Sequence, residues 1–177
     1  MSATPSPSSD AVKRLTVTDI GRSDVLVMAA AVADFRPRRR SSTKLTREDG
    51  DGLTLELEPT EDILAGAAAA ARAAGAREPR PLLVGFAAET GSLERAADKL
   101  RRKNIDMIVA NDVSEAGSGF GTDTNRVTIL TADGERAELP LLSKRAVADL
   151  LLDRVARALD DRDAAAQTEP MRQEIGR

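Results

Sequence analysis

The stretch VLVMAAAVADF, residues 25–35, decides the fold and also indicates a functional site. Large apolar residues lead into a run of alanines, which ends at one carboxylate, Asp34. The continuous apolar run at residues 25–31 is typical of a strand covered on both faces of a sheet. The alanines let a flat group approach the strand end, where backbone groups could bind a base edge and Asp34 could accept hydrogen bonds. A small-residue packing surface with Asp34 as a loop cap is the alternative, and residue types alone do not separate the two.

Two further apolar runs, at residues 81–88 (PLLVGFAA) and 106–112 (DMIVAND), also have the composition of buried strands. Helices are expected over residues 61–74, 92–103 and 143–159, with Thr60 as the cap of the first. Buried strands that alternate with helices predict an α/β fold, a three-layer, Rossmann-like and mostly parallel sheet. Ligands bind at the carboxyl ends of the strands in such sheets, which directs attention to residues 30–34, 85–90 and 110–112.

Two hairpins are predicted beside these elements. Residues 43–59 alternate in polarity around turn residues at 49–52, and residues 126–140 turn at Asp133-Gly134. The segment 35–47 carries six cations and no acid, so the first hairpin would form a basic flap. Across the chain we expect a disordered tail or weak edge strand at residues 1–22, one folded domain at 23–159 and a frayed tail at 160–177.

The composition excludes several kinds of chemistry. The chain has 177 residues without Cys or His, which removes the usual zinc sites, thiol nucleophiles, disulfides and serine–histidine triads. A net charge of −3 gives no global reason to bind nucleic acid or a membrane surface. Neither a run of about 20 apolar residues nor a secretory h-region is present, so we expect a cytoplasmic protein.

Several side chains near the predicted strand ends are candidates for binding. Phe86 is either a core residue or a wall against a base or sugar. Lys99 and Lys103 share one helix face and would bind phosphate if a second cationic segment, such as the one with Lys44, faced them. Asn111 ends the third strand and either holds a loop or contacts a substrate.

Six motifs together identify a family resemblance. They are AAVADFRP (30–37), Lys44, PTEDIL (59–64), VGFAAET (84–90), a K…KNxDxIVAND pattern (99–112) and GF…N (119–125). In this order they resemble the ligase domain of bacterial phosphopantothenate–cysteine ligase, or phosphopantothenoylcysteine synthetase, over about residues 23–159. That domain usually follows a flavin-dependent decarboxylase, so FMN would belong only to a decarboxylase domain that is absent here.

The resemblance implies a two-step reaction in coenzyme A biosynthesis. CTP would activate the carboxylate of 4′-phosphopantothenate as an acyl-cytidylate, and the amine of L-cysteine would then displace CMP. Mg²⁺ would be held by the nucleotide phosphates, with no protein ligand. The family also implies a homodimer and a possible decarboxylase flavoprotein partner. The sequence does not decide whether the nucleotide is CTP or ATP, and it does not fix the oligomeric state.

Family roles carry over to individual positions. Lys44 would be catalytic and would neutralise the triphosphate. The nucleotide site would comprise Met28, Ala29, Ala30, Asp34, Lys44, Glu61, Asp62, Ile63, Leu64, Phe86, Lys99 and Lys103. Substrate or dimer contacts would come from Asn111, Asp112, Phe120 and Asn125.

The sequence departs from the family pattern in two places. The family's Lys-x-Lys-Lys cluster is Lys44-Leu45-Thr46-Arg47 here, and arginine does not replace lysine in geometry. The family's opening strand and Gly/Ser-rich helix start are not found before residue 23, so we expect a sheet without its first strand or two. The alternative function is therefore a CTP-binding or dimerisation module without full activity by itself.

Overall fold

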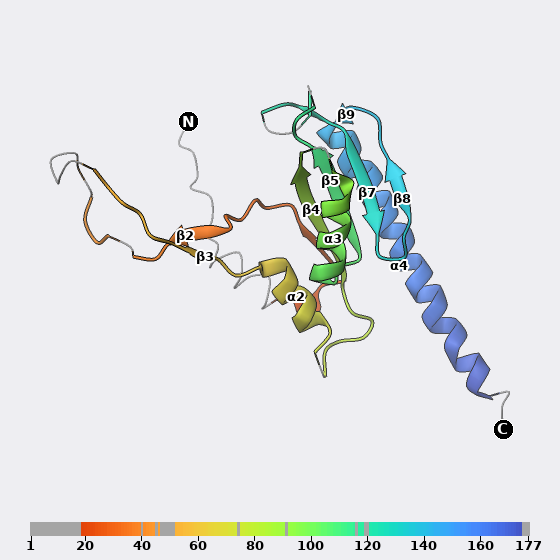
Figure 1. Ribbon diagram of the computed structural model, residues 1–177. Helices are drawn as coiled ribbons and strands as arrows, with labels where there is room; N and C mark the ends of the chain where they lie inside the picture. The colour runs from red at the N-terminus through yellow and green to blue at the C-terminus, as the bar shows by residue number, and fades with distance from the viewer. Residues whose placement is uncertain are drawn as a thin grey trace.

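A computed structural model describes residues 19–39, 41–44, 46, 52–73, 75–90, 92–115, 117–118 and 121–174, with side chains through residue 167. Its centre is a five-stranded sheet in the order β1-β4-β5-β7-β8 (Figure 1). The first three strands of that order are parallel, and the last two are antiparallel. The five strands are β1 (Val25–Met28), β4 (Leu82–Glu89), β5 (Met107–Asp112), β7 (Val127–Thr131) and β8 (Arg136–Glu138). The predicted α/β, Rossmann-like, mostly parallel architecture is confirmed.

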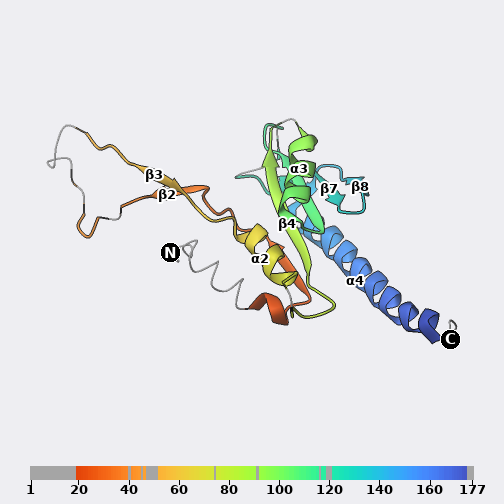
Figure 2. The same cartoon turned by 60° about the horizontal axis from the view of Figure 1, so that its bottom comes forward.

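Helices cover both faces of the sheet (Figures 1 and 2). Alternate side chains of a strand point to opposite faces. Leu83 of β4 therefore packs with α2 (Ile63–Ala71) and α3 (Leu93–Lys103), whereas its neighbour Leu82 packs with α4 (Lys144–Glu174). Both leucines are almost fully buried, so the core consists of two apolar layers, one on each side of the sheet.

Smaller elements complete the chain. The 3-10 helix η1 (Ile20–Arg22) places Ile20 in the α2–α3 layer. Two short antiparallel pairs are β2 (Phe35–Pro37) with β3 (Leu57–Pro59), and β6 (Thr124–Asn125) with β9 (Leu142–Ser143). The β7–β8 hairpin turns at Asp133-Gly134 as predicted, and Gly134 has the positive φ of +96° that such a turn requires.

Helix α2 begins two residues later than expected. Its cap is Asp62, not Thr60, because the Asp62 carboxylate accepts a hydrogen bond from the Ala65 N–H at 3.1 Å. The helix then packs closely on the sheet at Gly85. A Cβ at that position would lie 2.8 Å from Cδ2 of Leu64, so the absence of a side chain permits the approach.

Two expectations about the elements were wrong, and two others lie largely outside the described residues. The strand expected at 25–31 covers only 25–28, and Val27 is 39% exposed because β1 is an edge of the sheet formed by the described residues. The flap, residues 35–59, pairs at its base through β2 and β3, with no strand at the described residues of 43–47. The expected turn at 49–52 lies outside the described residues apart from Gly52, as does the expected tail at 1–22 apart from 19–22.

The C-terminal helix is longer than expected, because the tail predicted to fray at residue 160 continues α4 to Glu174. Arg162 explains part of this extension. Its guanidinium donates to the Asp106 carboxylate at 2.8 Å and to the backbone carbonyl of Arg80 at 3.3 Å, which fixes the helix to the sheet beyond residue 159. Within the described part of the chain, no helix is both long and apolar enough to cross a bilayer.

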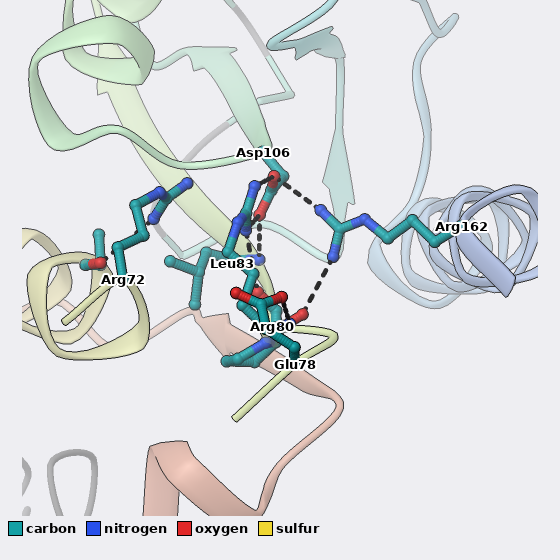
Figure 3. Close-up of polar contacts among 8 residues, drawn as sticks. Arg72, Glu78, Arg80, Leu83, Asp106 and Arg162 are labelled. Atoms are coloured by element: carbon teal, nitrogen blue, oxygen red, sulfur yellow. Dashed lines mark hydrogen bonds and ion pairs between the residues drawn. The ribbon is translucent and has the colours of Figure 1, made fainter. Parts of the chain in front are cut away.

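Asp106 is the centre of a polar network at the amino ends of β4 and β5 (Figure 3). The side chain is only 12% exposed. It accepts two hydrogen bonds from Arg80 at 2.7 and 2.9 Å, one from Arg162 and one from the Leu83 N–H at 2.8 Å. One carboxylate therefore joins the starts of two strands to the C-terminal helix.

Candidate functional site

A cavity of about 640 Å³ lies at the carboxyl ends of β1, β4 and β5. This is the edge at which α/β sheets bind ligands. Its floor is formed by the strand ends, and its walls by the loop after β1, the first residues of α2, the polar face of α3 and the start of α4. The three segments that sequence reasoning selected thus meet in one place.

The alanine-rich segment after β1 forms one side of this cavity. Residues 29–34 follow the strand as irregular chain, and Ala29 and Ala30 are exposed to the cavity. The segment is held by Thr60, whose N–H donates to the Asp34 carbonyl at 2.8 Å and whose hydroxyl donates to the Ala33 carbonyl at 2.5 Å. The Asp34 carboxylate has no hydrogen-bond or ion-pair partner among the described residues and is available to a ligand.

The lysines of α3 reach the cavity in ion pairs. Lys99 Nζ lies 2.7 Å from Oε1 of Glu89, whose side chain is only 7% exposed at the end of β4. Lys103 Nζ lies 3.0 Å from the Asp62 carboxylate. Partial burial by itself would raise the pKa of Asp62, but the Ala65 N–H and the Lys103 ammonium outweigh it and hold the pKa below its ordinary value. Both lysines are therefore fixed in position before any anion binds.

Phe86 faces the cavity and not the core. It is 43% exposed in the middle of β4, although its neighbours Gly85 and Ala87 are buried. The described residues leave the α4 side of β4 uncovered at this point, and the aromatic ring lines the cavity. An exposed ring on a cavity wall is a suitable surface for a nucleobase or a sugar.

The structure brings most of the sequence-predicted site residues to this cavity. Those on its wall are Met28, Ala29, Ala30, Asp34, Glu61, Asp62, Ile63, Leu64, Phe86, Lys99, Lys103, Asn111 and Asn125. Lys44 is not among them, because it lies on the flap, which projects away from the sheet (Figures 1 and 2).

Two other predicted residues are not placed on the wall. Asp112 accepts hydrogen bonds from the backbone N–H of Ser114 at 2.9 Å and from its hydroxyl at 2.5 Å, so it shapes the loop after β5. Phe120 lies outside the described residues. Among the described residues, no cluster of three or more His, Cys, Asp or Glu side chains could hold a metal ion.

Two further cavity residues are of functional interest, and sequence reasoning missed one of them. Helical spacing places Arg102 near the α3 face of the two lysines, and the structure brings it to the cavity, although it was not among the predicted site residues. Lys144 comes from the start of α4, and only the pairing of β6 with β9 brings it to the cavity. No local pattern could have indicated that contact.

Comparisons with known proteins agree with this architecture. Residues 6–159 match the family described as the DNA/pantothenate metabolism flavoprotein C-terminal domain. The coenzyme A biosynthesis bifunctional protein CoaBC of Bacillus subtilis (strain 168) is 47% identical over 135 residues, which are 76% of this chain and 31% of that protein. A cysteine/cysteine sulfinic acid decarboxylase from an unknown prokaryotic organism is 40% identical over 138 residues, 77% of this chain and 36% of that protein.

A solved structure is similar in fold as well as in sequence. The crystal structure of the C-terminal domain of the coenzyme A biosynthesis bifunctional protein CoaBC matches with a TM-score of 0.66 at 38% identity, covering 89% of this chain and 68% of that one. The chain spans about a third of the length of the two curated relatives given above. By the family match, the sequence identity and the shared fold, the chain belongs to the DNA/pantothenate metabolism flavoprotein C-terminal domain family, the phosphopantothenate–cysteine ligase family that its motifs resemble.

Proposed function

We propose that the chain is a ligase domain of coenzyme A biosynthesis that joins 4′-phosphopantothenate to L-cysteine through an acyl-cytidylate formed from CTP. The observation that carries this proposal is the cavity at the strand ends, in which a backbone-lined segment, an exposed aromatic ring and two fixed lysines converge. Positioned cations and backbone donors suit the stabilisation of phosphoryl and acyl transfer. Such chemistry needs neither a histidine nor a cysteine from the protein.

Each side of the cavity then has a role. The backbone at residues 28–30 and the Asp34 carboxylate would bind the nucleoside, with Phe86 packed against it. Lys99 and Lys103 would bind the triphosphate. A Mg²⁺ ion would fit as a group held by the phosphate oxygens, since the described wall offers cations and amides more than carboxylate clusters. When bound, the ion would neutralise charge on the phosphates during transfer.

Lys44 enters this proposal only with the flap in a different position. It would stabilise charge at the α-phosphorus if the flap of this chain, or of a second copy, lay over the cavity. Its present distance from the wall favours the alternative that the chain alone binds CTP, or dimerises, without completing the reaction. Nucleotide binding is therefore a more direct test than turnover.

Calorimetric titration with CTP and with ATP, each with Mg²⁺, tests the function. We expect CTP to bind and ATP to bind at least about 10-fold more weakly, because hydrogen bonds to a base edge discriminate between bases by roughly 1–3 kcal/mol. The absence of heat with either nucleotide, for a sample whose circular dichroism shows a folded α/β domain, would contradict the proposal.

We further propose that the flap forms a homodimer contact. The flap carries Phe35, Leu53, Leu55 and Leu57, each more than half exposed, and strand pairing places Phe35 and Leu57 on one face. The opposite face carries polar residues and the Arg36–Glu58 ion pair at 2.8 Å. An isolated two-stranded ribbon is marginally stable, and a second copy offers an identical apolar face that can cover this one by two-fold symmetry.

Sedimentation velocity of Leu55→Glu tests the dimer. A carboxylate forced into the apolar contact costs several kcal/mol, so the dimer dissociation constant is expected to rise by on the order of 100-fold. Thr54→Glu is the matched control, because it adds the same charge at the neighbouring position without removing an exposed apolar side chain. The proposal fails if the wild-type chain is monomeric at all accessible concentrations or if both variants dimerise alike.

A further inference from the structure

We propose that Lys144 binds an anionic group of a substrate other than the nucleotide, on the opposite side of the cavity from the α3 cations. The group is a carboxylate or a phosphate, and the inference rests on the proposed ligase function. It adds to the site a residue that none of the six sequence motifs contains.

Tertiary pairing fixes the backbone of Lys144 at the cavity. β9 pairs with β6, so that Leu142 lies opposite Asn125, and the Lys144 N–H donates to the Asp123 carbonyl at 2.9 Å. The next turn is fixed by the Ser143 hydroxyl, which accepts from the Ala146 N–H at 3.1 Å. The Lys144 side chain thus lines the cavity from a rigid junction between a strand and a helix.

The lysines on the two sides of the cavity differ in whether they have ion-pair partners. Lys99 and Lys103 are already paired with Glu89 and Asp62. The Lys144 ammonium, in contrast, has no hydrogen-bond or ion-pair partner among the residues that the structure describes. The side-chain amide of Asn111, on the same cavity wall, is also unpartnered within the described chain. An anion on this side would therefore meet an uncompensated cation together with a neutral hydrogen-bond donor.

The sheet separates these two groups of cations. Helix α3 packs on the Leu83 side of the sheet, whereas α4, which begins at Lys144, packs on the Leu82 side (Figure 1). The proposed reaction brings together a triphosphate, a phosphorylated carboxylic acid and an amino acid. Anionic groups from separate molecules repel each other, so they need separate cations. The α3 lysines suit the triphosphate, which leaves Lys144 for the acid or for the amino acid carboxylate.

Calorimetric titration of the whole chain tests this assignment. The separate probes are CTP–Mg²⁺, 4′-phosphopantothenate and L-cysteine. The last two are titrated both with and without CTP present. The variants are Lys144→Gln, which removes the charge, and Lys144→Arg, which keeps it. Arg145→Gln is the control, because Arg145 is the next residue, pairs with Asp149 at 3.0 Å and does not line the cavity. Thermal unfolding of each variant verifies that it is folded.

We expect Lys144→Gln to weaken binding of one non-nucleotide probe by about 10- to 100-fold, as for the loss of a hydrogen bond to a charged group. CTP affinity should stay within about threefold, Lys144→Arg should recover most of the loss, and Arg145→Gln should match wild type. A loss confined to 4′-phosphopantothenate assigns Lys144 to the acid, and a loss confined to L-cysteine assigns it to the amino acid carboxylate.

Two results would overturn the inference while the proposed function stands. In the first, the wild-type chain binds all three probes and Lys144→Gln binds each of them with the same affinity. In the second, Lys144→Gln loses as much affinity for CTP as for the non-nucleotide probe. If folded wild-type chain binds none of the probes, the proposed function fails and the inference fails with it.

Discussion

Asp106→Ala is expected to lower the free energy of unfolding by about 3 kcal/mol, the largest stability effect among the charged residues described above. The substitution leaves Arg80 and Arg162 without their shared carboxylate and the Leu83 N–H without its acceptor. Removing one member of a largely buried ion pair leaves an uncompensated charge, which costs more than the pair itself contributes. Urea unfolding followed by circular dichroism at pH 7 measures the change.

The control for Asp106 is Asp98→Ala. Asp98 pairs with Arg101 on the exposed side of α3, where both side chains are more than half exposed. An exposed pair contributes roughly 0–1 kcal/mol, so the urea midpoint should hardly move. Equal effects of the two substitutions would show that the Asp106 network does not join the strands to α4 as the structure indicates.

The effect of Asp106 should also depend on pH. Burial by itself would raise its pKa, but the Arg80 hydrogen bonds, the Leu83 N–H and the Arg162 charge lower it below its ordinary value. A lowered carboxyl pKa gives stability that is fully present above the unfolded-state pKa and is lost as the pH falls through the folded-state pKa. The difference in unfolding free energy between wild type and Asp106→Ala should thus be constant from about pH 5 to 8 and shrink below about pH 4.

CTP affinity is expected to fall by about 100-fold when Lys99 and Lys103 are both replaced by glutamine. Each ammonium would donate a charge-assisted hydrogen bond to the triphosphate, worth roughly 1.5–3 kcal/mol. The lower end of that range applies, because each lysine already has a carboxylate partner with which the phosphate must compete. Calorimetry with CTP–Mg²⁺ measures the loss, and raising the salt concentration should weaken wild-type binding more than binding by the variant.

Arg101→Gln is the matched control for the lysine pair. Arg101 belongs to the same helix, carries the same charge and pairs with Asp98 away from the cavity. The single variant Lys103→Gln is included because it is expected to fold even if the double variant does not. Its ion-pair partner Asp62 is half exposed and keeps the hydrogen bond that it accepts from the Ala65 N–H. If Arg101→Gln weakened CTP binding as much as Lys103→Gln, the attraction would be a property of net charge and not of this site.

Local patterns predicted the parts of the fold whose causes are local. The strands β4 and β5 were found from continuous apolar runs, and α3 ends at Lys103, followed by Asn104 in a left-handed conformation with φ of 52°. The spacing of Lys99 and Lys103 likewise placed both on one helix face, and the structure brings both to the cavity.

Features that depend on distant partners were not predicted. Val27 is exposed because no described strand lies beyond β1 in the sheet. The apolar run at residues 25–31 does not reveal that β1 is an edge strand. The extension of α4 depends on Arg162 meeting Asp106, 56 residues away in sequence. Lys144 reaches the cavity through the pairing of two strands of two residues each, which are too short to leave a periodic signal.

Gly85 leaves room for two apolar side chains beneath the site. A methyl group there would lie 2.8 Å from Cδ2 of Leu64 and 3.0 Å from Cδ1 of Ile105, so these side chains would have to shift. Leu64 itself lines the cavity and follows Asp62, whose carboxylate holds Lys103, by two residues. The missing side chain at position 85 therefore lets Leu64 occupy its place on the cavity wall. Altering the size of ligand that the cavity accepts would begin with the volumes at positions 64, 85 and 105, none of which carries a charge.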